Sequence, residues 1–209
     1  MSSNRSGPES ASSTELPLLG APVRERVDAA RNRLRVLAAA EALFAERGVD
    51  AVTMDDIAGA AGVGKGTLYR RFGDKAGLAM ALLDEREREL QERILTGPPP
   101  LGPGAAPAER LGAFVEGYLD LLARQLDLVL LSETATTGAR FRTGAHALWR
   151  QHCRHLFAAG GVADAEIAAD VLLAALAAEQ VRHWLRDREL APAALAESLV
   201  RLVRTWLPE

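Results

Sequence analysis

Hydroxyl and cationic side chains gather between Thr53 and Lys75, in the segment TMDDIAGAAGVGKGTLYRRFGDK. Ammonium and guanidinium groups neutralise phosphates and release the counterions condensed on a nucleic acid. A phenol or an aliphatic hydroxyl donates a hydrogen bond to a phosphate oxygen. The side chains suited to this chemistry are those of Thr53, Lys65, Thr67, Tyr69, Arg70, Arg71 and Lys75.

The same segment contains the signals of two short helices joined by a tight turn. Thr53 and Asp56 fit a capping box, in which a hydroxyl and a carboxylate satisfy free N–H groups at a helix start. Gly62 stands where a left-handed helix end is expected, and a second helix begins near Gly64. Two helices joined by a short turn with glycine are typical of the helix-turn-helix, whose second helix enters the major groove of DNA.

The second helix begins with small, hydroxyl-bearing and basic residues. Lys65, Gly66 and Thr67 lie where a recognition helix reads base edges: a Thr methyl can touch a thymine methyl, and Lys can reach guanine. Gly66 costs about 1 kcal/mol of helix propensity relative to Ala. Close approach of the helix to a sugar-phosphate chain explains that cost, and tolerated sequence drift is the alternative.

Residues 24–83 resemble the DNA-binding domain of TetR-type transcriptional regulators. The matching text is RVLAAAEALFAERGVDAVTMDDIAGAAGVGKGTLYRRFGDKAGL, which repeats the family's LF-x-E-x-G, T-x-x-x-I-A, G-V-x-x-x-T-L-Y and F-x-x-K-x-x-L. The resemblance implies DNA contacts by Thr53, Thr67, Tyr69, Arg71 and Lys75. The alternatives are that Tyr69 is a half-buried core residue with a wet hydroxyl and that Lys75 is a plain surface lysine.

Charge and composition agree with a DNA-binding segment attached to a different kind of domain. Residues 21–77 contain ten basic and eight acidic residues, so this segment carries +2 and the rest −5 of the net charge of −3. The single cysteine, Cys153, excludes an internal disulfide and suits a reducing cytoplasm. We expect no membrane span and no signal sequence, because no long apolar run and no basic-then-apolar N-terminus are present.

The predicted fold class is all-α, since no run alternates with the period of a strand. Three regions are predicted: a mobile tail over 1–22, a three-helix DNA-binding domain over 23–73, and a helical effector-binding and dimerisation domain over 74–209. Helices are expected near 24–47, 75–95, 108–125, 126–132, 141–159 and 164–188, with a loop over 96–107, and a last helix starts in the region 192–194 and runs to about 206. Several arginines lie near the start of the first helix, where they either form a solvated face or contact DNA phosphates. They are Arg24, Arg26, Arg31, Arg33 and Arg35.

The C-terminal pattern predicts assembly. Residues 164–188 are apolar nearly all round in their first half, so this helix is either central to a core or buried from two sides. The resemblance implies that the last two long helices, about 164–207, form a four-helix bundle across a twofold axis. A homodimer reads two half-sites and therefore a pseudo-palindromic operator. An ordinary monomer core is the alternative.

Aromatic residues in the body predict a pocket for a small-molecule effector, although plain core packing explains such stripes as well. The candidates are Phe114, Tyr118, Phe141, His146 and Trp149. His152, Cys153 and His155 could suggest a metal site or a catalytic thiol. A metal site would need a second cluster of ligands, and a catalytic thiol would need an orienting carboxylate motif, and the sequence offers neither. We therefore predict no metal, no cofactor and no catalytic residues.

The sequence as a whole predicts a dimeric transcriptional regulator in the cytoplasm, a repressor released from its operator by a small-molecule effector. It is not expected to be an enzyme. Two other interpretations stay open: an architectural DNA-binding protein without an effector, which would have a filled core, and a helical enzyme using metal or thiol chemistry.

Overall fold

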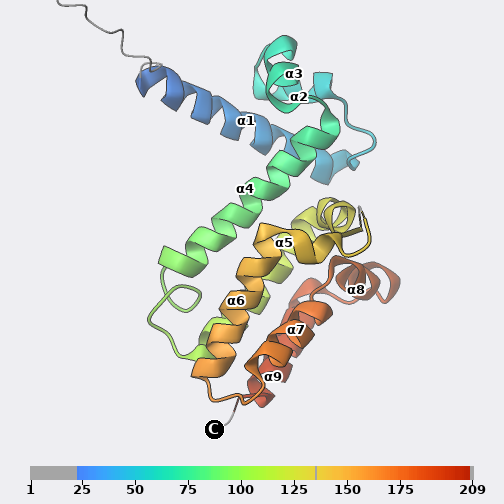
Figure 1. The fold of residues 1–209 in the computed structure, drawn as a ribbon. Helices are drawn as coiled ribbons and strands as arrows, with labels where there is room; N and C mark the ends of the chain where they lie inside the picture. Colours follow the sequence, from blue (N-terminus) through green and yellow to red (C-terminus); the bar gives the residue numbers. More distant parts are fainter. Residues whose placement is uncertain (1–22, 135, 208–209) are drawn as a thin grey trace, which may run out of the picture.

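The computed structural model describes residues 23–134 and 136–207, and every regular element in these ranges is helical, as predicted. The tail predicted over 1–22 lies outside the described residues. The helices, drawn in Figure 1, are α1 (Val23–Arg47), α2 (Met54–Ala61), α3 (Lys65–Phe72), α4 (Lys75–Thr96), α5 (Pro107–Thr134), α6 (Gly144–Ala159), α7 (Ala165–Ala175), α8 (Ala178–Arg182) and α9 (Pro192–Thr205), with a 3-10 turn η1 (Ala139–Arg142) and a π-helical turn η2 (His183–Asp187).

Helices α1, α2 and α3 form a small unit at one end of the long helix α4 (Figure 1). Helix α1 buries Leu37 and Ala40, α2 buries Ile57, and α3 buries Leu68 and Phe72. The helical spacing of these apolar residues gives each short helix one buried side and leaves its polar side in solvent. Helix α4 packs against both α1 and α5, so it connects this unit to the rest of the chain.

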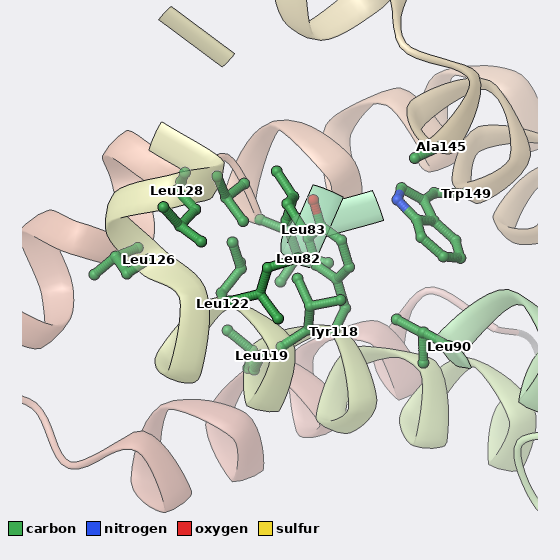
Figure 2. Packing of buried hydrophobic residues seen from close by; sticks show 14 of the residues in the cluster. Leu82, Leu83, Leu90, Tyr118, Leu119, Leu122, Leu126, Leu128, Ala145 and Trp149 are labelled. Atoms are coloured by element: carbon green, nitrogen blue, oxygen red, sulfur yellow. The ribbon is translucent and has the colours of Figure 1, made fainter. Parts of the chain in front are cut away.

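The body is built around α5, which packs on α4, α6, α8 and α9. Figure 2 shows buried side chains of this core, with Leu82 and Leu83 of α4 and Leu122 of α5 near its centre and Trp149 of α6 to the right. Helix α5 bends at Gln125, whose backbone leaves the helical region (φ −124°, ψ 24°). The predicted helices 108–125 and 126–132 are therefore one element with a kink at their junction. Among the described residues, no helix is both long and apolar enough to cross a membrane.

The predicted start of one helix needs correction. The helix expected over 141–159 begins only at Gly144, because Thr143 caps it by accepting a hydrogen bond from the His146 N–H (3.1 Å). The residues before Thr143 form the separate turn η1.

The prediction of a single helix over 164–188 was wrong. Helix α7 ends at Ala175, Ala177 is extended (φ −59°, ψ 139°), and α8 begins at Ala178. The N–H of Ala178 donates to Glu133 Oε2 at 2.8 Å, so a carboxylate from α5 satisfies the start of the new helix. The chain turns here through a contact with another helix, without a Gly or Pro in the sequence to signal it.

Candidate nucleic-acid interface

The start of α2 has the predicted capping box. The Asp56 N–H donates to Thr53 Oγ1 (3.2 Å), and the Thr53 N–H donates to Asp56 Oδ2 (2.9 Å). The Thr53 hydroxyl also donates to Asp56 Oδ2 at 2.6 Å, and these bonds hold the pKa of the Asp56 carboxyl below its usual value. A phosphate at Thr53 would compete with Asp56 for this hydroxyl proton. Thr53 is exposed at the start of α2, at the opposite end of this helix from the turn that leads to α3.

The turn between α2 and α3 has the geometry of a helix-turn-helix. Gly62 is left-handed (φ 62°), as predicted, and its carbonyl and that of Ala61 accept hydrogen bonds from Arg35 of α1 at 3.3 and 2.8 Å. Helix α3 then exposes Lys65, Gly66, Thr67, Tyr69, Arg70 and Arg71 while it buries Leu68 and Phe72. One short helix therefore presents almost all of the predicted DNA-contacting residues to solvent.

Gly66 has open space beside it. A Cβ added at this position would meet no heavy atom within 4 Å, so neither close packing nor a left-handed backbone requires a glycine here. Tyr69 is 49% exposed, which is unlike a core residue. Both observations favour a surface shaped for an external partner.

The basic side chains divide into two groups. Three of the four predicted cations make contacts inside the protein: Lys65 Nζ lies 2.5 Å from Asp55 Oδ2, Arg71 donates to the Ala29 carbonyl (2.9 Å), and Lys75 donates to the carbonyls of Val49 (2.8 Å) and Asp50 (3.1 Å). The contact with Asp55 raises the pKa of Lys65. Arg70 makes no such contact with a described residue. Lys75 and Arg71 thus hold α4 and α3 in place, whatever they do toward DNA.

Replacing Lys75 by Met should lower the free energy of unfolding by about 2 kcal/mol, because two carbonyls lose a charged donor. Urea denaturation of the purified chain measures this. Arg70→Met is the matched control, since it removes a cation from the same surface without breaking an internal contact, and its unfolding free energy should stay within about 0.5 kcal/mol of the parent. Equal stabilities of the two variants would show that Lys75 is only a surface lysine.

Some of the arginines near the start of α1 make contacts inside the fold. Arg33 lies 3.4 Å from Glu85 of α4, and Arg35 is bonded to the turn after α2, so neither extends freely as an arm. Arg31 lies 3.8 Å from Asp28 on the same helix, and the side chains of Arg24 and Arg26 lie outside the described residues. Sequence reasoning missed the roles of Arg33 and Arg35, because no local pattern signals a contact with a partner so distant along the chain.

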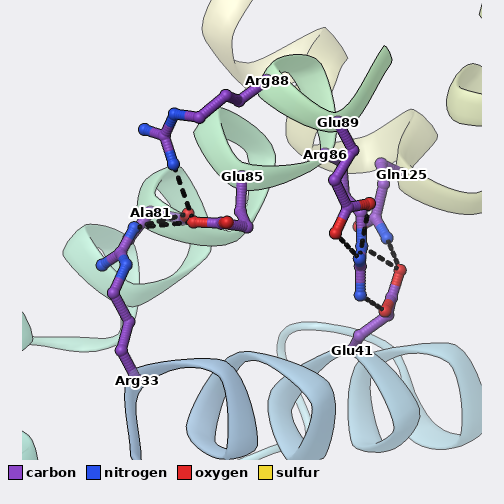
Figure 3. A network of polar contacts seen from close by, with 8 residues as sticks. All are labelled: Arg33, Glu41, Ala81, Glu85, Arg86, Arg88, Glu89 and Gln125. Carbon is purple, nitrogen blue, oxygen red and sulfur yellow. Dashed lines mark hydrogen bonds and ion pairs between the residues drawn. The ribbon is translucent and has the colours of Figure 1, made fainter. Parts of the chain in front are cut away.

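A polar cluster joins the unit of α1, α2 and α3 to the body where α1, α4 and α5 meet (Figure 3). Glu41 of α1 accepts hydrogen bonds from Arg86 of α4 and from Gln125 Nε2 at the kink of α5 (2.6 Å). Arg86 also pairs with Glu89 at 2.7 Å. We call these four residues the Glu41 network. Gln125 is 5% exposed, so its amide depends on Glu41 for a partner.

The predicted effector residues divide between the core and the surface. Tyr118, His146 and Trp149 line an internal cavity of about 20 Å³. Phe114 lies against them, with ring centroids 5.7 Å from Tyr118 and 6.0 Å from Trp149, but it is fully buried and does not line the cavity. Phe141 is 71% exposed and packs edge-on against His146. Three of the five residues therefore meet around one cavity.

The residues considered for metal or thiol chemistry do not form a site in the part of the chain described. No group of three or more His, Cys, Asp or Glu there is arranged to hold a metal ion. Cys153 is fully buried, and burial raises the pKa of its thiol. Burial, with Arg110 and His155 nearby, lowers the pKa of His152 to about 4.

Comparisons with known proteins agree with this geometry. Residues 36–82 match the family model described as bacterial regulatory proteins, tetR family. Over 61 residues the chain is 44% identical to the HTH-type transcriptional regulator TtgR of Pseudomonas putida, and the match covers 29% of each chain. The chain thus spans under a third of the length of the curated relatives that it matches first.

Solved structures extend the likeness over most of the chain. NalD, the secondary repressor of the MexAB-OprM multidrug efflux pump in Pseudomonas aeruginosa, is 27% identical with a TM-score of 0.54, covering 87% of this chain and 98% of that one. A transcriptional regulator of the TetR/AcrR family from Thermobifida fusca is 25% identical with a TM-score of 0.63, covering 83% and 96%. The all-helical body is thus similar to regulators of this kind as well.

Proposed function

We propose, since residues 36–82 belong to the tetR family of bacterial regulatory proteins, that this chain is a DNA-binding transcriptional regulator that represses from an operator. The observation that carries the proposal is the exposed surface of α3, where Gly66, Thr67, Tyr69 and Arg70 make no contact that the fold requires. Thr67 and Gly66 would face base edges, and Tyr69, Arg70 and Thr53 would contact phosphates. Lys65, Arg71 and Lys75 would add phosphate contacts at the expense of their internal partners.

A homodimer is part of the proposal. Helix α7 exposes Ile167 (62%), Val171 (49%) and Ala174, which recur at four- and three-residue steps on one face. Helix α9 exposes the uncharged face formed by Ala194, Ser198, Leu202 and Thr205.

Helix α6 contacts the C-terminal end of α9 and packs along α7. Trp206 at the end of α9 packs on Phe157, with ring centroids 5.9 Å apart, and α7 begins a few residues after Phe157. We propose that the two exposed faces bury each other across a twofold axis, and that the pair of DNA-binding units then reads a pseudo-palindromic operator.

Release by a small molecule completes the mechanism. A ligand shifts the regulator away from DNA only if it binds the released conformation more tightly than the DNA-bound one. Helix α4 lines the cavity through Glu87 and holds the DNA-binding unit through the Glu41 network, so a change at the cavity reaches α1 through a single rigid element. A surface groove of about 490 Å³ shares Glu87, Ser132 and Thr143 with this cavity and would give an effector the space that an architectural protein does not need. Because the thiol of Cys153 is fully buried, thiol catalysis is not part of the proposal.

The proposal is tested with duplex DNA from the region upstream of the chain's own coding sequence. Fluorescence anisotropy at several salt concentrations should give a specific complex whose affinity falls linearly in a log–log plot against salt, as phosphate contacts require. A scrambled duplex of the same length should bind far more weakly. Equal affinity for both duplexes would leave a non-specific DNA binder, and no binding to either would refute the proposal.

Gly66→Ala should separate fold from function. The helix gains about 1 kcal/mol of stability, because Ala is the better helix former and has room. The added methyl lies on the DNA-facing surface, so affinity for the operator should fall about tenfold, the equivalent of about 1.4 kcal/mol.

Gly59→Ala in α2 is the control, since a Cβ there also meets nothing within 4 Å. It should gain similar stability and keep its DNA affinity. If the Gly66→Ala chain binds the operator with unchanged affinity, α3 does not lie in the DNA groove.

A further inference from the structure

We infer, building on the proposed function, that the effector is an organic cation whose charged nitrogen sits between the Glu87 carboxylate and the rings of Tyr118 and Trp149. The family match leaves the chemical class of the ligand open. The local charge and the aromatic lining of the cavity select one class.

The cavity lies between α4, α5, η1 and α6 and connects with a larger hollow. Glu87, Ser132 and Thr143 line both the internal cavity of about 20 Å³ and a surface groove of about 490 Å³. The groove continues along α4 and the start of α6, past Met80, Leu83, Asp84, Gln91 and Leu148. The internal cavity holds little more than a water molecule. A ligand would therefore place its head group beside Glu87 and its remaining atoms in the groove.

Glu87 is the carboxylate without a counter-charge. No basic side chain among the described residues forms an ion pair with it, and its charged neighbours are Asp84 and Glu133. Burial and these two acids raise the pKa of Glu87 to about 7. A partly buried carboxylate without a counter-charge is costly when it ionises, and a bound cation removes that cost.

The basic side chains near the cavity already face carboxylates. Arg140 lies 3.6 Å from Glu133 and donates to the Leu173 carbonyl, and Glu133 also accepts from the Ala178 N–H. Arg88, at the edge of the groove, pairs with Glu85 at 2.9 Å. An anionic ligand would thus meet the carboxylates of Glu87 and Asp84, which are unpaired in the described part of the chain. Arg140, whose Nε makes no hydrogen bond with a described residue, already faces Glu133. A neutral ligand would leave Glu87 unpaired.

The aromatic side chains complete the fit to a cation. Tyr118 is 5% exposed, its hydroxyl makes no hydrogen bond with a described residue, and it lines the cavity together with Trp149. Their ring centroids are 5.9 Å apart with planes inclined at 62°, so a face of one ring lies beside an edge of the other. Aromatic faces attract ammonium groups, most strongly where water is excluded.

Binding of such a cation should depend on pH. The groups that face Glu87 are Asp84 on its own helix, Glu133 and Tyr118 on α5, Arg140 on η1 and His146 on α6. Burial and Arg140 lower the pKa of His146, so it stays neutral at pH 7 and does not oppose the ligand. With its pKa near 7, Glu87 is mostly protonated at pH 6 and ionised at pH 8, so cation affinity should rise about tenfold between them.

Calorimetry with three probes that share a phenylmethyl group tests the class directly: benzylammonium, whose head group is close to a water molecule in size, benzyl alcohol and phenylacetate. The full-length chain should bind the cation at least tenfold more tightly than either other probe. Glu87→Gln should weaken cation binding tenfold or more and abolish its pH dependence. Glu92→Gln, an exposed carboxylate of the same helix that lines neither hollow, should change neither.

Several results would overturn the inference: preference for phenylacetate or benzyl alcohol, no binding of the cation, or a Glu87→Gln chain that binds the cation as tightly as the parent. Operator binding by the same samples without any probe tests the proposed function separately. Glu87 lies in the body, so Glu87→Gln should keep the parent's operator affinity, which also shows that the variant folds. If the chain binds the cation but not DNA, the inferred ligand class stands and the proposed function as a regulator is refuted.

Discussion

A Val171→Glu chain is expected to be monomeric and to lose operator binding by about 100-fold or more. The proposed dimer face places each Val171 in the interface, and the twofold axis introduces the new carboxylate twice, so two charges lose water without gaining a partner. A monomer binds one half-site only and forfeits the gain from simultaneous engagement of two sites, which is commonly two to four orders of magnitude. Sedimentation velocity and anisotropy on the same preparation measure both effects.

The fold itself should survive this substitution, because the Val171 side chain is half exposed in a single chain. Leu95→Glu is the matched control, an exposed leucine at the end of α4 away from the proposed face, and it should leave both the dimer and the DNA affinity unchanged. A Val171→Glu chain that still sediments as a dimer would move the interface elsewhere.

Glu41→Ala should lower the free energy of unfolding by about 2 kcal/mol or more and weaken the response of DNA binding to an effector. Arg86 loses one of its two carboxylate acceptors and keeps Glu89, whereas Gln125 loses its acceptor and is almost fully buried, so its amide is left unsatisfied. The contact also joins α1 to α4 and α5, so its loss separates movements of the body from the DNA-binding unit. Urea denaturation measures the first effect, and release of operator by the cationic probe measures the second.

Glu89→Ala provides the control for the Glu41 network. Glu89 pairs with the same Arg86, but from the same helix and with its side chain about half exposed, so it joins no two elements. Its removal should cost about 0.5 kcal/mol and leave effector release intact. If both variants lose equal stability and respond equally to the probe, the network transmits nothing between the domains.

Local signals predicted the ends of the DNA-binding helices well. Thr53 with Asp56, and Gly62, each act within three or four residues along the chain, and each occupies the cap that its type predicted. The first helix, expected near 24–47, likewise agrees with α1 (Val23–Arg47). Such features are legible in a sequence because the two partners are neighbours in it.

Features that depend on distant partners were not predictable in the same way. The break between α7 and α8 follows from the bond between Glu133 and Ala178, and the alanine-rich segment itself gives no stop signal. Phe141 belongs by type to an aromatic cluster, yet η1 carries it to the surface. The lack of a counter-charge at Glu87 is equally invisible in the sequence, where basic residues stand on both sides of it.

The hydrogen bonds of Lys75 and Arg71 to carbonyls of other segments bear on how such sequences are compared. Lys75 is one of the positions that define the motif, and both side chains are occupied in assembling three helices. Descendants that had lost every affinity for nucleic acid would still be selected to retain them. A relative that has Lys75 and Arg71 but a bulky side chain at position 66 is therefore expected to keep the fold without binding DNA.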